Sequence, residues 1–172
     1  MQSTSMKASS ALAAEYIREL ESEVRATREC LAVVPMDKPD WKPHDKSMQL
    51  GYLAVLVADI PRWIQHAIEK GEVDFATYEQ AKATTAEELV AHFDKSVEAA
   101  KTALQNVSDD RLKKTFYLKN DGQELFKSPI DETIMSSINH MVHHRGQLSV
   151  YLRLQDVAVP SIYGPSADSG GF

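Results

Sequence analysis

Two histidines near the end of the chain have the spacing of a metal-binding pair. His140 and His144 lie four residues apart in the helix-like segment INHMVHHRGQLSVYLRL. Both imidazoles therefore share one helix face, a turn apart, where they can hold one metal ion. A third protein ligand normally comes from a facing helix, and buried histidines that bond to neighbouring side chains give the same spacing. His143 lies about 100° round the helix from His144 and is expected outside the site.

The same segment supplies three further polar side chains. Arg145 directly follows the pair, so we expect a buried ion pair with Asp59 or Glu132, or a contact to an anionic ligand. Gln147 and Tyr151 continue the stripe of the two histidines and are candidates to line a site. Packing with a hydrogen-bonded polar tip is the alternative, and it is favoured for Tyr151.

Four segments with helical periodicity must position these side chains. Helices are expected over residues 9–34, 47–70, 85–106 and 128–155, followed by an irregular tail over 157–172. Ser47 is the expected N-cap of the second helix, and Ser128 before Pro129 that of the last. Pro61 should kink or divide the second helix.

Asp59 stands out because it is a carboxylate at the end of a long apolar run. It lies two residues before Pro61. One interpretation is a hydrogen bond to backbone groups that the proline frees. The other is that the carboxylate faces the histidine site.

The stretch before the last helix predicts a small amount of extended structure. Residues 108–112 suit one helical turn. Residues 113–118 and 123–127 flank the turn sequence Asn120-Asp121-Gly122, which indicates a short hairpin or an extended loop. No other segment is a convincing strand. The predicted fold class is therefore all-α, a four-helix bundle whose order is up-down-down-up or up-down-up-down.

Composition limits the classes of function. The 172 residues are expected to form one domain over 1–172, and the net charge of −6 without a basic stripe excludes a nucleic-acid surface. Cys30 is the only cysteine, and a buried inert thiol is the favoured interpretation. The N-terminus lacks the apolar stretch of a signal peptide, and the apolar run at 52–58 is too short to cross a membrane. These features predict a cytoplasmic protein without a membrane partner.

Two stretches resemble a known family. The run NHMVHHRGQLSVYLRL, followed by VPSIYGPSAD, is similar to the last helix and tail of the DinB-like (DinB/YfiT) superfamily. The run WKPHDKSMQLGYLAVLVADIPRW is similar to that family's second helix, and the resemblance covers nearly the whole chain. It implies a four-helix bundle, often dimeric, with a metal held by three histidines. It also implies thiol-dependent transferases and isomerases that use bacillithiol, mycothiol or glutathione.

The resemblance carries over to only part of the metal site. His140 and His144 match the family's H-x-x-x-H pair, whereas Leu56 occupies the position of the second-helix histidine, and leucine cannot bind a metal. Asp59, three residues on, replaces it only if the kink at Pro61 turns the carboxylate toward the pair. His44, His66 and His92 have no spacing that brings them to the pair.

Two functions follow from this difference. One is a thiol-transferase-like enzyme with an incomplete site for a divalent metal, for which zinc and nickel are the favoured ions. Its substrate would be a small molecule or a low-molecular-weight thiol. The other is a metal-free bundle that binds a small molecule or serves as structure, with Leu56 in the space of the missing ligand. A homodimer is expected for both.

Overall fold

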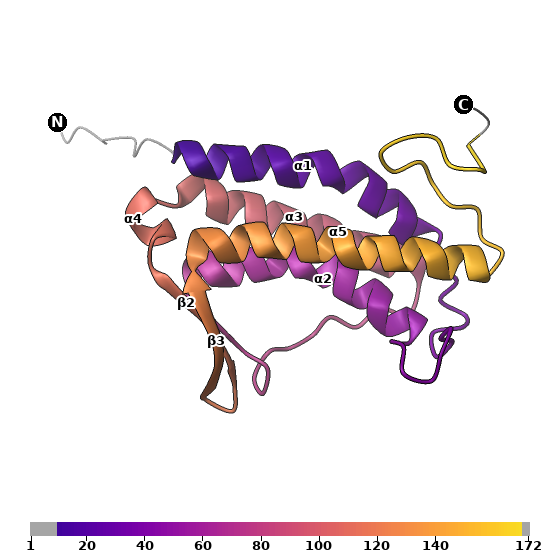
Figure 1. The fold of residues 1–172 in the computed structure, drawn as a ribbon, viewed down its shortest axis with the longest axis horizontal. Helices are drawn as coiled ribbons and strands as arrows, with labels where there is room; N and C mark the ends of the chain where they lie inside the picture. Colours follow the sequence, from indigo (N-terminus) through magenta and orange to yellow (C-terminus); the bar gives the residue numbers. More distant parts are fainter. Residues whose placement is uncertain (1–9, 170–172) are drawn as a thin grey trace.

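Four long helices lie side by side, and a small sheet projects from one end of them (Figure 1). The computed structural model describes residues 10–169. The long helices are α1 (Ala11–Ala32), α2 (Leu50–Glu69), α3 (Ala86–Asn106) and α5 (Ile130–Leu154), and α4 (Asp109–Leu112) is a single turn. The strands are β1 (Glu72–Asp74), β2 (Thr115–Asn120) and β3 (Gln123–Pro129). Residue 9 and residues 170–172, where a helix start and the end of the tail were expected, lie outside the described residues.

The order of the helices is one of the two that the sequence left open. α1 and α5 run in one direction, and α2 and α3 run in the other (Figure 1). α2 packs against α3 and α5, and α1 packs against the same two helices from the other side. The order is therefore up-down-down-up, with α2 and α3 as parallel neighbours. Both connections are long. Residues 33–49 cross the end of the bundle from α1 to α2, and residues 70–85 return along the bundle so that α3 can run parallel to α2.

α2 is the helix at the centre of the core. It is apolar on nearly every side, and Leu53, Val57, Ile60 and Ile64 are each at most 1% exposed. Burial of such side chains contributes about 1.5–3 kcal/mol each, so the core is anchored on this helix. α2 continues through Pro61 as one helix and is not divided there. None of the described helices is both long enough and apolar enough to span a membrane.

The start predicted for α2 is wrong by three residues. The helix begins at Leu50, and Ser47 does not cap it. The reason is that loop carbonyls receive the first amide groups: the N–H of Leu50 donates to Trp41 O, and that of Gly51 donates to Pro39 O, both at 2.8 Å. A helix end whose amides are satisfied by a folded loop needs no side-chain cap.

The start predicted for α5 is also shifted. Ser128 belongs to β3 and does not cap the helix, and its hydroxyl lies 2.7 Å from that of Thr133. Pro129 is the N-cap residue, and the N–H of Ile130 donates to Lys114 O at 2.9 Å. The hairpin thus continues directly into α5, without an intervening loop.

The three-stranded sheet corrects the all-α prediction. β2 and β3 form the expected hairpin, with Asp121 (φ 51°) and Gly122 (φ 75°) in the left-handed conformation that tight hairpin turns require. β1 pairs parallel to β2. A parallel pair needs a long crossover, and α3, which lies between the two strands in the sequence, provides it. β1 escaped prediction since it has only three residues, of which Val73 alone is buried. The turn predicted at 108–112 is confirmed as α4, with Ser108 as its N-cap.

Candidate functional site

The two histidines of α5 form a hydrogen-bonded chain with Gln147. Nε2 of His140 lies 2.7 Å from Nε2 of His144, and Nδ1 of His144 lies 2.7 Å from Oε1 of Gln147. Because an amide oxygen only accepts, His144 donates through its Nδ1–H, and its Nε2 is then an acceptor. His140 therefore donates through Nε2–H, which leaves a lone pair on its Nδ1. The geometry gives all three side chains a defined orientation.

Burial keeps His140 neutral. Its pKa falls to about 4, first because burial removes water from the imidazole, and then because His144 and His143 lie close by. His140 is thus an uncharged imidazole at neutral pH. His143 is exposed, as its angle on the helix predicts, although its ring lies 5.1 Å from that of His144.

Leu56 lies at the same cavity as the histidine pair. The cavity has a volume of 310 Å³, within the range of small-molecule sites. Its walls include both histidines, Leu56 and Asp59, with Trp63 and Phe75 beside them. Leu56 is 7% exposed, so its side chain occupies wall space that a ligating residue would need.

Asp59 is fully engaged by three other side chains. Its Oδ2 accepts from Tyr78 Oη at 2.6 Å, and its Oδ1 lies 2.7 Å from Nε2 of His92 and 3.2 Å from Nε of Arg62. Both oxygens therefore already have partners, and Asp59 also lines the cavity of the histidine pair. The interpretation that Asp59 bonds backbone groups freed by Pro61 is wrong, because its partners are side chains of α2, α3 and the connection between them.

Tyr78 closes this cluster as a hydrogen-bond donor. Burial and the contact with Asp59 raise the pKa of its phenol, so the hydroxyl stays protonated. The guanidinium of Arg62 lies 4.7 Å from the Tyr78 ring centroid, a cation–π contact. The negative charge of Asp59 is thus balanced where it is buried.

Arg145 pairs with neither residue that the sequence suggested. Its partner is Glu23 of α1, with Nη1 to Oε2 at 2.6 Å, and the two side chains are 1% and 7% exposed. Nη1 also donates to Thr27 Oγ1 at 3.0 Å, and Nη2 donates to Tyr163 Oη at 2.8 Å. The expectation of Asp59 or Glu132 is wrong because Arg145 lies on the face of α5 that packs on α1, away from α2.

Tyr151 packs in the core with its hydroxyl hydrogen-bonded, which agrees with the packing role that the sequence favoured for it. It is 9% exposed, and its hydroxyl donates to Met48 O at 3.2 Å. Its ring meets the loop tryptophan Trp41 edge-on, with 5.5 Å between centroids. These contacts tie the end of α5 to the loop before α2, and Tyr151 is absent from the walls of the histidine cavity.

A second and more apolar cavity adjoins the first. It has a volume of 570 Å³ and lies between the hairpin, α5 and the side of α2. Its walls include Phe116, Leu118, Phe126 and Met135, together with Trp63 and His140, which also line the first cavity. The rings of Trp63 and His140 lie 5.5 Å apart and form the division between the two spaces.

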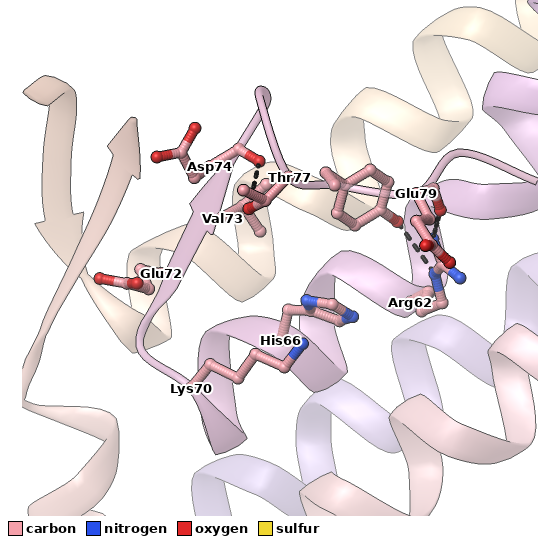
Figure 2. A pocket seen from close by; sticks show the side chains of 9 residues that line it. Arg62, His66, Lys70, Glu72, Val73, Asp74, Thr77 and Glu79 are labelled. Carbon is pink, nitrogen blue, oxygen red and sulfur yellow. Dashed lines mark hydrogen bonds between the residues drawn. The ribbon is translucent and has the colours of Figure 1, made fainter. Parts of the chain in front are cut away.

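A third, polar cavity of 340 Å³ lies between the last turns of α2 and the segment that follows it (Figure 2). Arg62 and His66 of α2 and Lys70 directly after it line this cavity together with residues from the segment 72–79, and Figure 2 shows the carboxylates of Glu72 and Asp74 pointing away from these basic side chains. Burial, Lys70 and Arg62 lower the pKa of His66. His66 lines this cavity and not the one that His140 faces, so it does not join the pair.

Sequence reasoning missed three residues of the site. Trp63 lies one helical turn after Asp59, a spacing that places both on one face and could have found it. His92 and Tyr78 reach Asp59 from α3 and from an irregular segment, and no local spacing signals either contact. Trp63 also has an indole N–H without a hydrogen-bond partner among residues 10–169.

The donor set does not match the three-histidine metal centre that the resemblance implies. Two imidazoles converge, but the third position is a hydrocarbon side chain, and Asp59 already has three partners. Within residues 10–169 no three His, Cys, Asp or Glu side chains lie together as a metal site would need.

Comparison with known proteins identifies the family. The model of the DinB family matches residues 1–170, whereas no curated protein matches the chain. A DinB-like protein from Bacillus subtilis is 17% identical with a TM-score of 0.67, covering 88% of this chain and 99% of its own. One from Bacillus cereus is 23% identical with a TM-score of 0.65, covering 86% and 95%. A putative family member from Exiguobacterium sibiricum is 18% identical with a TM-score of 0.63, covering 88% and 97%. The chain belongs to the DinB family.

Proposed function

We propose that this DinB family protein binds a small molecule at the histidine cavity without a metal ion. In this proposal the four long helices act as one four-helix bundle domain of the DinB/YfiT type, in the cytoplasm. The observation that carries it is the side chain of Leu56 at the wall where the family's third ligand is expected. In this proposal the cavity still binds a small molecule, but no metal ion takes part.

The hydrogen-bonded chain supports a recognition role for the histidines. His144 uses both ring nitrogens, one toward Gln147 and one toward His140. A side chain whose two ring nitrogens both have hydrogen-bond partners is held in one orientation without a metal. His140 then presents a defined hydrogen-bonding edge at the boundary of the two cavities.

The two cavities support a small organic ligand. Their volumes of 310 and 570 Å³ fall in the range of drug-sized sites, and most of the lining surface is apolar. Burial of apolar ligand surface would supply the affinity, and the few polar groups would supply orientation. A fully filled core in the place of the cavities would have favoured a purely structural role.

A metal-dependent, thiol-transferase-like enzyme is the second candidate. The observation that favours it is the convergence of Nε2 of His140 and Nε2 of His144 within 2.7 Å. Zinc or nickel held by this pair would need its other ligands from outside the protein. This function predicts metal in the purified protein and its loss in His144→Ala.

A fragment screen in EDTA tests the proposed function. The indole N–H signals of the two tryptophans report separately: Trp63 lines both cavities, and Trp41 packs on Tyr151 as an internal reference. We expect some small aromatic and aliphatic fragments to move the Trp63 signal and leave that of Trp41, with Trp63→Phe assigning the peak. Fragments that bind only after zinc or nickel is added, or no binding at Trp63, would contradict the proposal.

A further inference from the structure

The two cavities together form one site of two unlike compartments. The outer compartment, lined by Phe116, Leu118, Phe126 and Met135, is mainly hydrocarbon. The inner compartment holds Asp59, Tyr78 and the histidine pair. A molecule that spans the Trp63–His140 division would place an apolar group outside and a polar group inside. The site thus selects for molecules with both parts.

Neither compartment offers a positive charge to a ligand, and no unbalanced charge is buried in either of them. Among the described side chains that line them there is no lysine or arginine. The buried carboxylate of Asp59 is balanced by Arg62 and has both oxygens engaged. Glu132 lines the outer compartment but is exposed, so water screens its charge: it disfavours a carboxylate and attracts a cation only weakly. Burial of a charged group without a partner is strongly unfavourable, so an uncharged ligand fits best.

The division between the compartments offers a hydrogen-bond acceptor. The chain from Gln147 through His144 makes His140 donate through Nε2–H, so Nδ1 of His140 keeps its lone pair. No described group donates to this atom, and the side chain lines both cavities. A ligand hydroxyl or N–H would donate a hydrogen bond to Nδ1 of His140. An ether oxygen has no proton to donate, so it would leave this acceptor unpaired.

We infer that the ligand is an uncharged amphipathic molecule, with an aromatic or branched apolar group in the outer compartment and a hydroxyl or N–H that donates to Nδ1 of His140. This inference rests on the proposed function and specifies its ligand class. Charge neutrality follows from the compensated Asp59, and the need for a donor follows from the orientation of the histidine chain.

Four probes that share one ring test the inference. Benzyl alcohol is neutral and donates, benzyl methyl ether is neutral without a donor, and benzoate and benzylammonium carry opposite charges. Each is titrated in EDTA, with the Trp63 indole signal as the readout. We expect benzyl alcohol to bind about tenfold or more tightly than each of the others, since an unpaired acceptor or a buried charge weakens binding by at least that factor.

Matched variants locate the two contacts. His140→Phe should remove the preference for the alcohol over the ether, whereas His143→Phe, at the exposed neighbour, should retain it. Met135→Trp should fill the outer compartment and reduce binding at least about tenfold. Val150→Trp adds the same ring at a similarly exposed position of α5 (56% against 52%), outside both cavities, and should leave binding unchanged.

The outcomes separate this inference from the proposed function. Benzoate or benzylammonium binding as tightly as benzyl alcohol, or the ether matching the alcohol, would overturn the inference and leave a metal-free binding site. Failure of all four probes while other fragments move Trp63 would do the same. If no fragment shifts the Trp63 indole signal without added metal, both the inference and the proposed function are wrong.

Discussion

At the scale of single residues, the chemistry of the site depends on what stands beside His140 and His144. Spacing in the sequence identified the pair, and the resemblance to the DinB-like superfamily pointed to Leu56 as the unusual residue. The sequence did not reveal that Gln147 orients His144, or that Asp59 is held by His92 and Tyr78. The two contacts of Asp59 join residues 19 and 33 positions apart, and only folding brings them together.

Gln147 is expected to fix the tautomer of His144. In Gln147→Leu the acceptor at Nδ1 is lost, so His144 should change from one tautomer to a mixture, while stability changes by less than about 0.5 kcal/mol because the residue is exposed. Long-range ¹⁵N–¹H spectra of the imidazoles measure this directly, with Gln123→Leu in the hairpin as the control. If His144 of the native protein is protonated at Nε2 and not at Nδ1, the hydrogen bonds from Gln147 to His140 have the opposite direction.

Cys30 is expected to be unreactive in the folded protein. It is fully buried, and burial raises the pKa of its thiol to about 11, so almost no thiolate exists at neutral pH. A thiol-specific reagent such as DTNB should react with it at pH 7.5 only after unfolding in guanidinium. Rapid stoichiometric reaction of the native protein would instead indicate an accessible thiol.

At the scale of elements, the long helices were predictable and their first residues were not. Apolar periodicity spans many residues and survives local variation, so the bounds of the four helices agree to within three residues. The starts of α2 and α5 shifted because carbonyls of Pro39, Trp41 and Lys114 satisfy their first amides. A cap supplied by a distant segment leaves no mark in the local sequence.

Asp74 is expected to hold the hairpin turn against β1. Its carboxylate accepts from the N–H groups of Gly122 (2.7 Å), Asp121 (2.9 Å) and Ala76 (2.9 Å). Asp74→Asn should speed hydrogen exchange at Asp121 and Gly122, because an amide offers only one acceptor oxygen. Glu124→Gln, on the same hairpin, provides the control. Unchanged exchange would show that the turn holds without Asp74.

The same clamp predicts a pH dependence. The backbone N–H groups, that of Gly122 first, lower the pKa of Asp74 in the folded state. A lowered folded-state pKa means that the stabilisation is present above the unfolded-state value, near 4, and is lost as pH falls through the folded-state value. The stability difference between the native protein and Asp74→Asn should therefore shrink below about pH 4. A difference that grows on acidification would contradict this assignment.

At the scale of the whole molecule, one buried ion pair joins three segments far apart in the chain. Arg145 of α5 meets Glu23 of α1, and Tyr163 of the tail donates to Glu23 at 3.0 Å. The sequence suggested other partners because the arrangement of helices was open, and α5 faces α1 on one side and α2 on the other. Family resemblance supplied the fold, but it did not supply this pairing.

Breaking this pair on one side should be costly. Arg145→Met leaves Glu23 buried without its cation, and the free energy of unfolding should fall by about 3–5 kcal/mol. The double variant Glu23→Leu/Arg145→Met should recover most of the loss, since two apolar side chains replace both charges. Chemical denaturation measures both, with Tyr163→Phe as the mild control. Equal losses in the single and double variants would show that packing, and not the uncompensated charge, dominates.

The proposed function requires that the histidine pair holds no metal, because Leu56 stands where the family's third ligand is expected. Elemental analysis of untagged, dialysed protein tests it most directly, beside Leu56→His and Leu56→His/His144→Ala. The account predicts a native protein with almost no metal, about one zinc or nickel ion per chain in Leu56→His, and none in the double variant. Near-stoichiometric metal in the native protein, lost in His144→Ala, would contradict it.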